Sequence, residues 1–155
     1  MSKLYKLGVI GNPIEHSMSP FIHSRFARYE NISLEYLPYK INESDFNKFV
    51  KEFFSDKHAK GLNVTLPYKK KAAEINGDIS KEAKYIIAVN TITNYKNKLS
   101  LASTDGIGFI DDINSKKFDL ENKKILIIGA GAASESVLYK VAKSKVNIKV
   151  TSDLD

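Results

Sequence analysis

A run of aliphatic residues that leads directly into a glycine turn is the feature that most constrains the fold of this chain. Residues 124–128 predict a buried strand, residues 129–134 a turn of small side chains, and residues 136–143 a helix. In such a unit the first glycine permits a tight turn, the second lets the backbone approach a pyrophosphate, and the helix N-terminus offers free N–H groups. The pattern favours a dinucleotide site over a turn without a ligand. The candidate cofactor-binding residues are Gly129, Ala130, Gly131, Ala132, Ala133 and Ser134.

One acidic residue stands where a dinucleotide site of this kind places a ribose ligand. Asp153 lies 22 residues after Gly131, close to the usual spacing of about 20 residues. A carboxylate there accepts hydrogen bonds from the adenosine 2′-hydroxyl and repels a 2′-phosphate. The alternative is a solvated acid in a turn, and the pattern leaves both interpretations open.

Strand and helix signals alternate along the whole chain, which is typical of α/β layers. Ser19 and Pro20 predict a helix start, with Ser19 as the N-cap and Pro20 at the first helical position. A polar stretch near residues 115–122 predicts a boundary between a domain over residues 1–115 and a second over residues 121–155. Strands are expected over residues 4–10, 34–41, 61–66, 87–95, 99–103, 124–128 and 146–151. Further helices are expected after residue 42, over 67–77, over 79–85, after 105 and over 136–143.

Composition excludes several classes of function. The 24 basic and 18 acidic residues give a net charge of +6, but only Arg25 and Arg28 are arginines, the side chain that nucleic-acid readers favour. A dispersed excess of lysine indicates a solvated surface that attracts anionic small molecules, so we expect no nucleic-acid partner. The chain has no cysteine and no apolar run that fits a membrane span or a signal peptide. We therefore expect a cytoplasmic protein without disulfides, thiolate metal sites or membrane contact.

Four segments place small hydroxyls, amides and one acid–base pair at predicted strand ends, over residues 11–20, 61–69, 88–91 and 103–106. Asn63 and Thr65 alternate along a short strand and therefore share one face. Neutral donors and acceptors beside one lysine, Lys69, and one aspartate, Asp105, suit a polyhydroxylated carboxylate. Each residue taken singly also has a structural explanation, such as a helix cap for Asp105 or a solvated surface for Lys69.

Together these segments resemble the shikimate dehydrogenase family. Its motif G-x-P-x-x-H-S-x-S-P is matched at residues 11–20, and G-x-N-V-T-x-P-[FY]-K at residues 61–69. A-V-N-T follows at residues 88–91 and T-D-G-x-G at residues 104–108, before the Gly-Ala-Gly turn. The resemblance covers the chain from Lys6 onward. It implies an N-terminal α/β substrate domain with a mixed sheet, followed by one βαβ unit that starts a Rossmann-type doubly wound domain.

The family reduces 3-dehydroshikimate to shikimate with NADPH in aromatic amino-acid biosynthesis, and the resemblance implies roles for the matched residues. The serines and the threonine would take the substrate carboxylate, the asparagines and the aspartate would hold ring hydroxyls, and Lys69 with Asp105 would form the catalytic pair. An ammonium can protonate the reacting oxygen and stabilise its developing charge. The implied substrate-binding residues are Ser17, Ser19, Asn63, Thr65, Lys69, Asn90 and Asp105.

The cofactor remains open because the sequence departs from the family pattern after the glycine turn. The family usually carries an arginine after its second cofactor-domain strand, and this arginine meets the 2′-phosphate of NADP. Here Ser152, Asp153 and Leu154 stand at that place, and no arginine follows residue 131. The resemblance implies NADP, whereas Asp153 favours NAD or no cofactor.

Length is the second departure, since one βαβ unit follows residue 121 where a doubly wound domain has two halves. The last strand would then expose a sheet edge and uncovered apolar surface. We expect a truncated chain, with three candidate functions: a shikimate dehydrogenase, a shikimate-binding module without hydride transfer, or half of a split enzyme that docks on another chain. A homodimer and a preference for quinate over shikimate also remain open.

Overall fold

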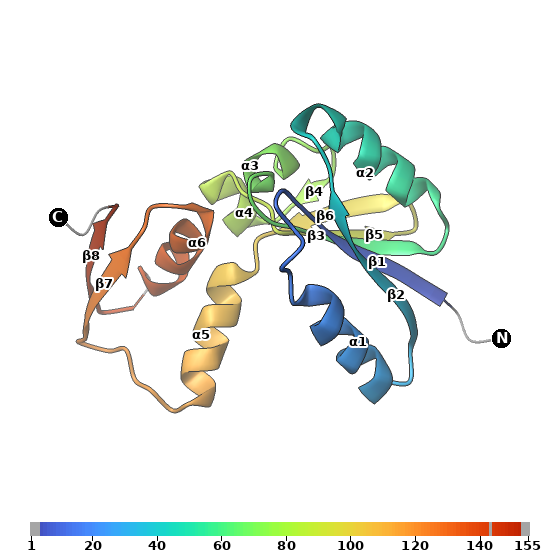
Figure 1. The fold of residues 1–155 in the computed structure, drawn as a ribbon. Coiled ribbons are helices and arrows are strands. Elements are labelled where there is room, and N and C mark those ends of the chain that lie inside the picture. The colour runs from blue at the N-terminus through green and yellow to red at the C-terminus, as the bar shows by residue number, and fades with distance from the viewer. Residues whose placement is uncertain (1–3, 143, 153–155) are drawn as a thin grey trace.

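The computed structural model describes residues 4–142 and 144–152, and their strands form two separate sheets (Figure 1). The larger sheet has six strands in the order β2-β1-β3-β5-β6-β4. Its strands are β1 (Leu4–Gly11), β2 (Ser33–Lys40), β3 (Ala59–Val64), β4 (Asp78–Ile79), β5 (Thr91–Tyr95) and β6 (Lys98–Ala102). The smaller sheet pairs β7 (Lys124–Ile128) with β8 (Asn147–Thr151).

Pairing directions make the larger sheet mixed, as predicted. β1 runs parallel to β2 and β3, whereas β5 is antiparallel to β3 and β6, and the short β4 is parallel to β6. The β5–β6 hairpin turns through Lys96 and Asn97, whose φ angles of 51° and 61° are those that a two-residue hairpin turn requires. β7 and β8 are parallel, so the expected α/β class with a final βαβ unit is confirmed.

Helices cover both faces of the larger sheet, with α1 and α2 on opposite sides (Figure 1). Phe46, Val50 and Phe53 of α2 are buried and join the main core with sheet residues such as Ile10 and Ile92. Each such side chain stabilises the fold by roughly 1.5–3 kcal/mol on burial. The helices are α1 (Ser19–Tyr29), η1 (Glu43–Asp45), α2 (Phe46–Ser55), α3 (Lys69–Ala72), α4 (Lys81–Ile86), α5 (Asp105–Ser115) and α6 (Ala132–Val141).

Helix starts differ from the prediction at two places. Met18, not Ser19, is the N-cap of α1, because the Ser17 hydroxyl accepts a hydrogen bond from the Ser19 N–H at 3.3 Å and Ser19 is already helical. The helix α6 begins at Ala132, four residues before the predicted start, since the glycine turn is shorter than expected.

Two predicted elements are shorter than expected. Only the four residues of α3 are helical within the range 67–77. Residues 87–90 do not belong to β5, because their backbone groups bond to different segments: the Val89 N–H donates to the Lys69 carbonyl and the Asn90 N–H to the Ala102 carbonyl. The Val89 bond holds the loop before β5 against α3, and the Asn90 bond holds it against the end of β6.

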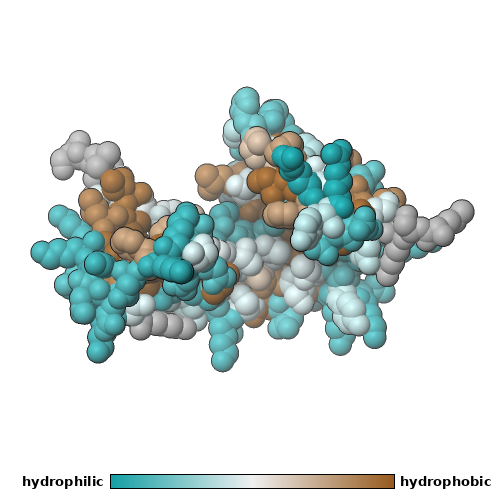
Figure 2. Space-filling view, turned by 90° about the horizontal axis from the view of Figure 1, so that it is seen from below, coloured by the Kyte–Doolittle hydropathy of each residue, from teal (hydrophilic) through white to brown (hydrophobic). Residues whose placement is uncertain are grey.

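The smaller sheet leaves apolar side chains in contact with solvent. Leu126 and Ile128 of β7 are 56% and 55% exposed, whereas Ile125 and Ile127 face the other side and are half-buried. Figure 2 shows apolar surface gathered at this end of the molecule. Helix α5 connects the two sheets and packs against α6. Within the part of the chain that the structure describes, no helix has the length and apolar character to cross a membrane.

We expect Ile87→Gly to stabilise the chain. Ile87 ends α4 in the left-handed region, at φ 51° and ψ 46°, where a β-branched residue is rare. This conformation costs an L-residue roughly 1–2 kcal/mol, and the side chain is 62% exposed, so its removal loses little burial. Urea titration should show the free energy of unfolding raised by about 1 kcal/mol in Ile87→Gly. The control Ile87→Ala retains the Cβ and should show no such gain, and an equal gain would contradict backbone strain as the cause.

Candidate active site

The register of the larger sheet brings four segments together at one edge (Figure 1). The parallel strands β1 and β3 end at Gly11 and Val64. β5 starts at Thr91, opposite Asn63 of β3, and β6 ends at Ala102, opposite Thr91. The loops after β1, β3 and β6 and the loop before β5 therefore lie side by side, and they contain the four polar segments of the sequence.

Asp105 holds the centre of this edge through both of its carboxylate oxygens. Lys69 Nζ donates to Asp105 Oδ2 at 2.5 Å, and Asn90 Nδ2 donates to Oδ1 at 2.7 Å. The Lys69 and Asp105 side chains are 14% and 29% exposed, so their ion pair is less screened than one on the open surface and can still be reached by a ligand. The structure thus brings Lys69, Asn90 and Asp105 into direct contact.

The amide of Asn90 has only one orientation that satisfies its neighbours. Its Oδ1 accepts hydrogen bonds from the Thr91 hydroxyl at 2.8 Å, the Thr104 N–H at 3.0 Å and the Thr104 hydroxyl at 3.1 Å. With donors gathered on the oxygen, the nitrogen must face the acceptor, which is Asp105. Asn90 therefore orients the Asp105 carboxylate as well as binding it.

Ser17, Ser19 and Thr65 share a small cavity beside this cluster. The cavity has a volume of 300 Å³, and its lining residues are Val9, Pro13, Ile14, His16, Ser17, Ser19 and Thr65. The Asn12 N–H donates to the Leu66 carbonyl at 3.1 Å, which ties the loop after β1 to the loop after β3. Hydroxyl donors beside one imidazole and three apolar side chains suit the binding of a small carboxylate.

Tyr36 connects the two halves of the site, and the sequence analysis did not find it. Its hydroxyl donates to Asn63 Oδ1 at 2.8 Å and is also hydrogen-bonded to the Ser19 side chain. Burial raises the pKa of Tyr36 to about 12. The ring stacks on His23 at a centroid distance of 4.3 Å, and burial lowers the pKa of that imidazole.

The glycine turn has the geometry of an anion site. Gly129 has a φ of 108°, which only glycine adopts readily. Gly131 is the N-cap of α6 and provides no side-chain cap for the first N–H groups of the helix. A Cβ added at Gly131 would meet no atom within 4 Å, so the backbone is open to an approaching ligand. The turn residues 129–134 therefore fit a pyrophosphate, whereas Asp153 lies outside the described residues.

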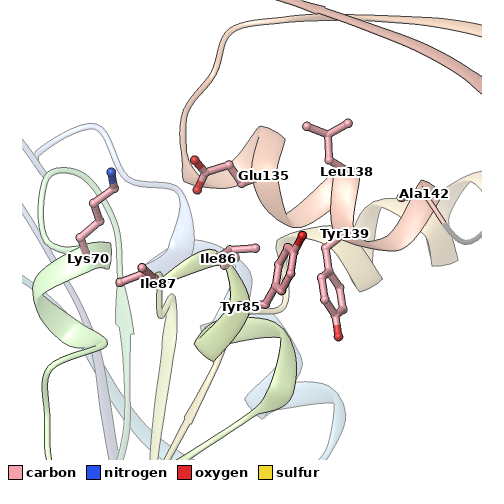
Figure 3. Close-up of a pocket in the computed structure, with 8 residues that line it drawn as sticks. All are labelled: Lys70, Tyr85, Ile86, Ile87, Glu135, Leu138, Tyr139 and Ala142. Carbon is pink, nitrogen blue, oxygen red and sulfur yellow. The ribbon is translucent and has the colours of Figure 1, made fainter.

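A separate cavity of 760 Å³ lies between α4 and α6 (Figure 3). Apolar and aromatic side chains such as Ile86, Leu138 and Tyr139 form most of its wall, with Lys70 and Glu135 as its charged members. Neither Lys69 nor Asp105 lines it. The residues that carry the candidate chemistry therefore lie outside this cavity.

Comparison with protein families identifies the segment that carries these residues. The family model described as the shikimate dehydrogenase substrate binding domain matches residues 9–92. A curated relative, shikimate dehydrogenase (NADP(+)) of Legionella pneumophila strain Lens, is 40% identical over 142 residues, which cover 92% of this chain and 53% of the relative. The chain thus spans about half the length of the curated relatives it matches.

Solved structures show the same architecture. Shikimate dehydrogenase from Aquifex aeolicus superposes with a TM-score of 0.88 at 33% identity, over 97% of this chain and 56% of that protein. Shikimate 5-dehydrogenase from Listeria monocytogenes, solved in complex with shikimate and NAD, superposes with a TM-score of 0.87 at 26% identity. This match covers 99% of the present chain and 54% of the Listeria protein.

Removing the Tyr36 hydroxyl should weaken the site without disturbing the core. In Tyr36→Phe, Asn63 Oδ1 loses its donor, and we expect the free energy of unfolding to fall by about 1–2 kcal/mol in urea titration. The matched control is Tyr39→Phe, because the Tyr39 ring packs against Phe49 and Phe53 on the other side of the fold. An equal loss in both variants would contradict a specific role for the bond between Tyr36 and Asn63.

The raised pKa of Tyr36 predicts an alkaline limit to stability. Because the folded pKa of about 12 exceeds the ordinary tyrosine pKa of 10.0, the stabilisation from the neutral phenol is complete below pH 10 and is lost as pH rises from 10 to 12. Thermal melts of the wild type and Tyr36→Phe should converge over this range. A stability difference that stays constant from pH 9 to about 12 would rule out the buried phenol as its source.

Proposed function

Because the chain belongs to the shikimate dehydrogenase family, we propose that it binds shikimate and 3-dehydroshikimate and carries the proton-transfer groups of the NADP-dependent, reversible reduction that joins them in aromatic amino-acid biosynthesis. Residues 1–115 would form the substrate-binding catalytic domain and residues 121–155 part of an NAD(P)-binding domain. The observation that carries the proposal is the contact of Asp105 with both Lys69 and Asn90 at the sheet edge.

Substrate binding would use the two halves of the site for different groups. The cavity of Ser17, Ser19 and Thr65 would take the carboxylate, since hydroxyl groups can donate to both of its oxygens. Asn63 and Asp105 would hold ring hydroxyls. Tyr36 is bonded to Asn63, and Asn90 and Lys69 are bonded to Asp105. A neutral site with one ion pair suits a substrate that carries one carboxylate and several hydroxyls. The dispersed positive charge of the chain would attract this negatively charged substrate.

Proton transfer would fall to Lys69. Its ammonium has three N–H donors, and Asp105 Oδ2 engages one of them. A second N–H would face the oxygen of the ketone, stabilise its developing negative charge and supply the proton that makes it a hydroxyl. Asp105 would orient the ammonium and accept a hydrogen bond from the neighbouring substrate hydroxyl. In the reverse direction, the amine of Lys69 would take up the proton.

The cofactor would lie on the glycine turn and the N-terminus of α6. Residues 129–134 would hold the pyrophosphate through backbone N–H groups, which the open space above Gly131 supports. When bound, a nicotinamide cofactor supplies the hydride that the ketone carbon receives. NADP is the proposed cofactor because the relatives carry it in their name, and NAD is the alternative that Asp153 favours.

A second candidate function is shikimate binding without hydride transfer by this chain alone. The exposed apolar side chains Leu126, Ile128 and Val150 on the smaller sheet favour it, since parallel sheets are normally covered on both faces. Hydride transfer would then need further polypeptide over that sheet, supplied by a completing chain or a second copy. Oxidation of shikimate with NADP by the purified chain separates the two candidates, and shikimate binding measured by calorimetry is expected in both.

Replacing Lys69 should affect turnover far more than binding. In Lys69→Ala, we expect NADP-linked shikimate oxidation to fall by about 10²–10⁴-fold, since the proton donor is lost. The dissociation constant for shikimate should change by less than about tenfold, because the other binding groups remain. Lys70→Ala is the matched control, as Lys70 follows directly but lines the other cavity. Unchanged turnover in Lys69→Ala would rule out the assigned role.

A methyl group at residue 131 should exclude the cofactor without unfolding the chain. Gly131 has a φ of −89° and open space around it, so Gly131→Ala is compatible with the fold. Its Cβ would enter the space of the pyrophosphate, and we expect NADPH affinity to fall by about tenfold or more with the melting temperature unchanged. Titrations followed by nicotinamide fluorescence measure this for NADPH and NADH. Tighter binding of NADH than of NADPH would overturn the choice of cofactor.

A further inference from the structure

Three polar side chains are fully enclosed where α4, α5 and α6 meet. Glu82 of α4 is 6% exposed, Ser103 before α5 is 7% exposed, and Ser136 of α6 is 0% exposed. Polar groups at this depth are costly unless each one is hydrogen-bonded. Their contacts therefore indicate what the enclosed cluster holds in place.

Only one assignment of donors and acceptors fits the hydrogen bonds of Ser136. Its hydroxyl donates to Glu82 Oε1 at 2.6 Å, and this uses its only proton. Ser136 Oγ then accepts from the Gly106 N–H at 2.8 Å and from the Ser103 hydroxyl at 3.1 Å. Lys140 Nζ lies 2.7 Å from Glu82 Oε2, so the carboxylate is bound at both oxygens. Each side-chain oxygen of Glu82, Ser103 and Ser136 thus has at least one partner.

Ser136 caps helix α5 from a different helix. The first N–H groups of a helix have no partner within it, and the N-cap residue Thr104 makes no side-chain cap. The Gly106 N–H, in the first turn of α5, is bound by Ser136 instead. Only glycine fits at residue 106, since an added Cβ would lie 2.1 Å from the Ser136 carbonyl oxygen. The start of α5 is thus locked onto α6.

The capped residue is the direct neighbour of Asp105. The peptide unit that joins Asp105 to Gly106 carries the N–H that Ser136 binds, so the position of Ser136 fixes the backbone from which the Asp105 carboxylate projects. That carboxylate must reach Lys69 Nζ and Asn90 Nδ2 at once. A shift of the peptide unit would lengthen at least one of these two bonds.

We infer that Ser136, held by Glu82, is a positioning residue that sets the Asp105 carboxylate against Lys69 and Asn90 and ties it to the helix that follows the glycine turn. The inference rests on the proposed function, which makes the Asp105 carboxylate part of a shikimate-binding site. No substrate contact by Ser136 or Glu82 is required, because both are enclosed.

Packing between α4 and α6 keeps the cluster in place (Figure 3). Tyr85 of α4 and Tyr139 of α6 contact each other at a ring-centroid distance of 5.2 Å. Ile86 and Leu138 line the cavity beside this ring contact. These apolar side chains keep Glu82 on α4 within reach of Ser136 on α6, 54 residues later in the chain.

The test compares Ser136→Ala and Glu82→Gln with the control Ser115→Ala. Ser115 lies on α5 at the end opposite Gly106, where its hydroxyl donates to the Asp112 carbonyl at 2.7 Å. The side-chain amide signal of Asn90 in a ¹H–¹⁵N spectrum reports the bond to Asp105 without any ligand. We expect this signal to shift in Ser136→Ala and Glu82→Gln and to stay unchanged in Ser115→Ala.

Calorimetric titration with shikimate gives the second readout. Loss of the cap should raise the dissociation constant about tenfold in Ser136→Ala and by a smaller factor in Glu82→Gln, with less than about a twofold change in Ser115→Ala. Glu82→Gln retains the side-chain volume and keeps the test available if Ser136→Ala does not fold. An Asn90 signal that stays unmoved in a folded variant of either residue, or that moves equally in Ser115→Ala, would overturn the inference. A shifted Asn90 signal with no shikimate binding by the wild type would support the positioning role and contradict the proposed function instead.

Discussion

The double hydrogen bonding of the Asp105 carboxylate is the interaction on which the site depends. Lys69 reaches it from the start of α3 and Asn90 from the loop before β5, and a backbone bond from the Val89 N–H to the Lys69 carbonyl joins these two segments. The carboxylate compensates the charge of a half-buried ammonium, which would otherwise be costly to hold away from water. Its Oδ2 also fixes the direction in which the Lys69 ammonium points, while Oδ1 is held by Asn90. The geometry of the remaining polar groups follows from this pair.

The sheet makes such an arrangement possible because its strands end at one edge. Parallel β1 and β3 deliver the loops of Ser17 and Thr65, and the antiparallel β5–β6 pair returns Asn90 and Asp105 to the same place. Tyr36 on β2 then connects the cavity of Ser17, Ser19 and Thr65 to Asn63 through its hydroxyl group. One sheet edge thus brings together hydroxyl groups, amides and an ion pair, to which the proposed function assigns the carboxylate, the ring hydroxyls and proton transfer.

Site residues that lie in short sequence motifs could be predicted from the sequence. Residues whose role depends on a contact between distant segments could not. Lys69, Asn90 and Asp105 lie in short motifs at predicted strand ends, so the sequence could name them as candidates, and the structure brings them into contact. Tyr36 lies within a strand, where the alternation of side chains predicts the face of the sheet on which Tyr36 lies but not its hydrogen-bond partner on another strand. The contact between Glu82 and Ser136 depends on how α4 and α6 pack, which no local pattern contains. The Ser19 cap was wrong for a local reason, because Ser19 is already helical and its own N–H donates to the Ser17 hydroxyl.

Titration of the ¹⁵N-labelled chain with shikimate tests the central claim most directly, since asparagine side-chain amides occur both inside and outside the site. Asn63 and Asn90 belong to the candidate site, whereas Asn76 and Asn97 line a cavity near the β5–β6 hairpin. The account predicts that the amide signals of Asn63 and Asn90 shift in a saturable way while those of Asn76 and Asn97 remain fixed. Shifts confined to Asn76 and Asn97, or no shift in any of the four at saturating shikimate, would contradict it.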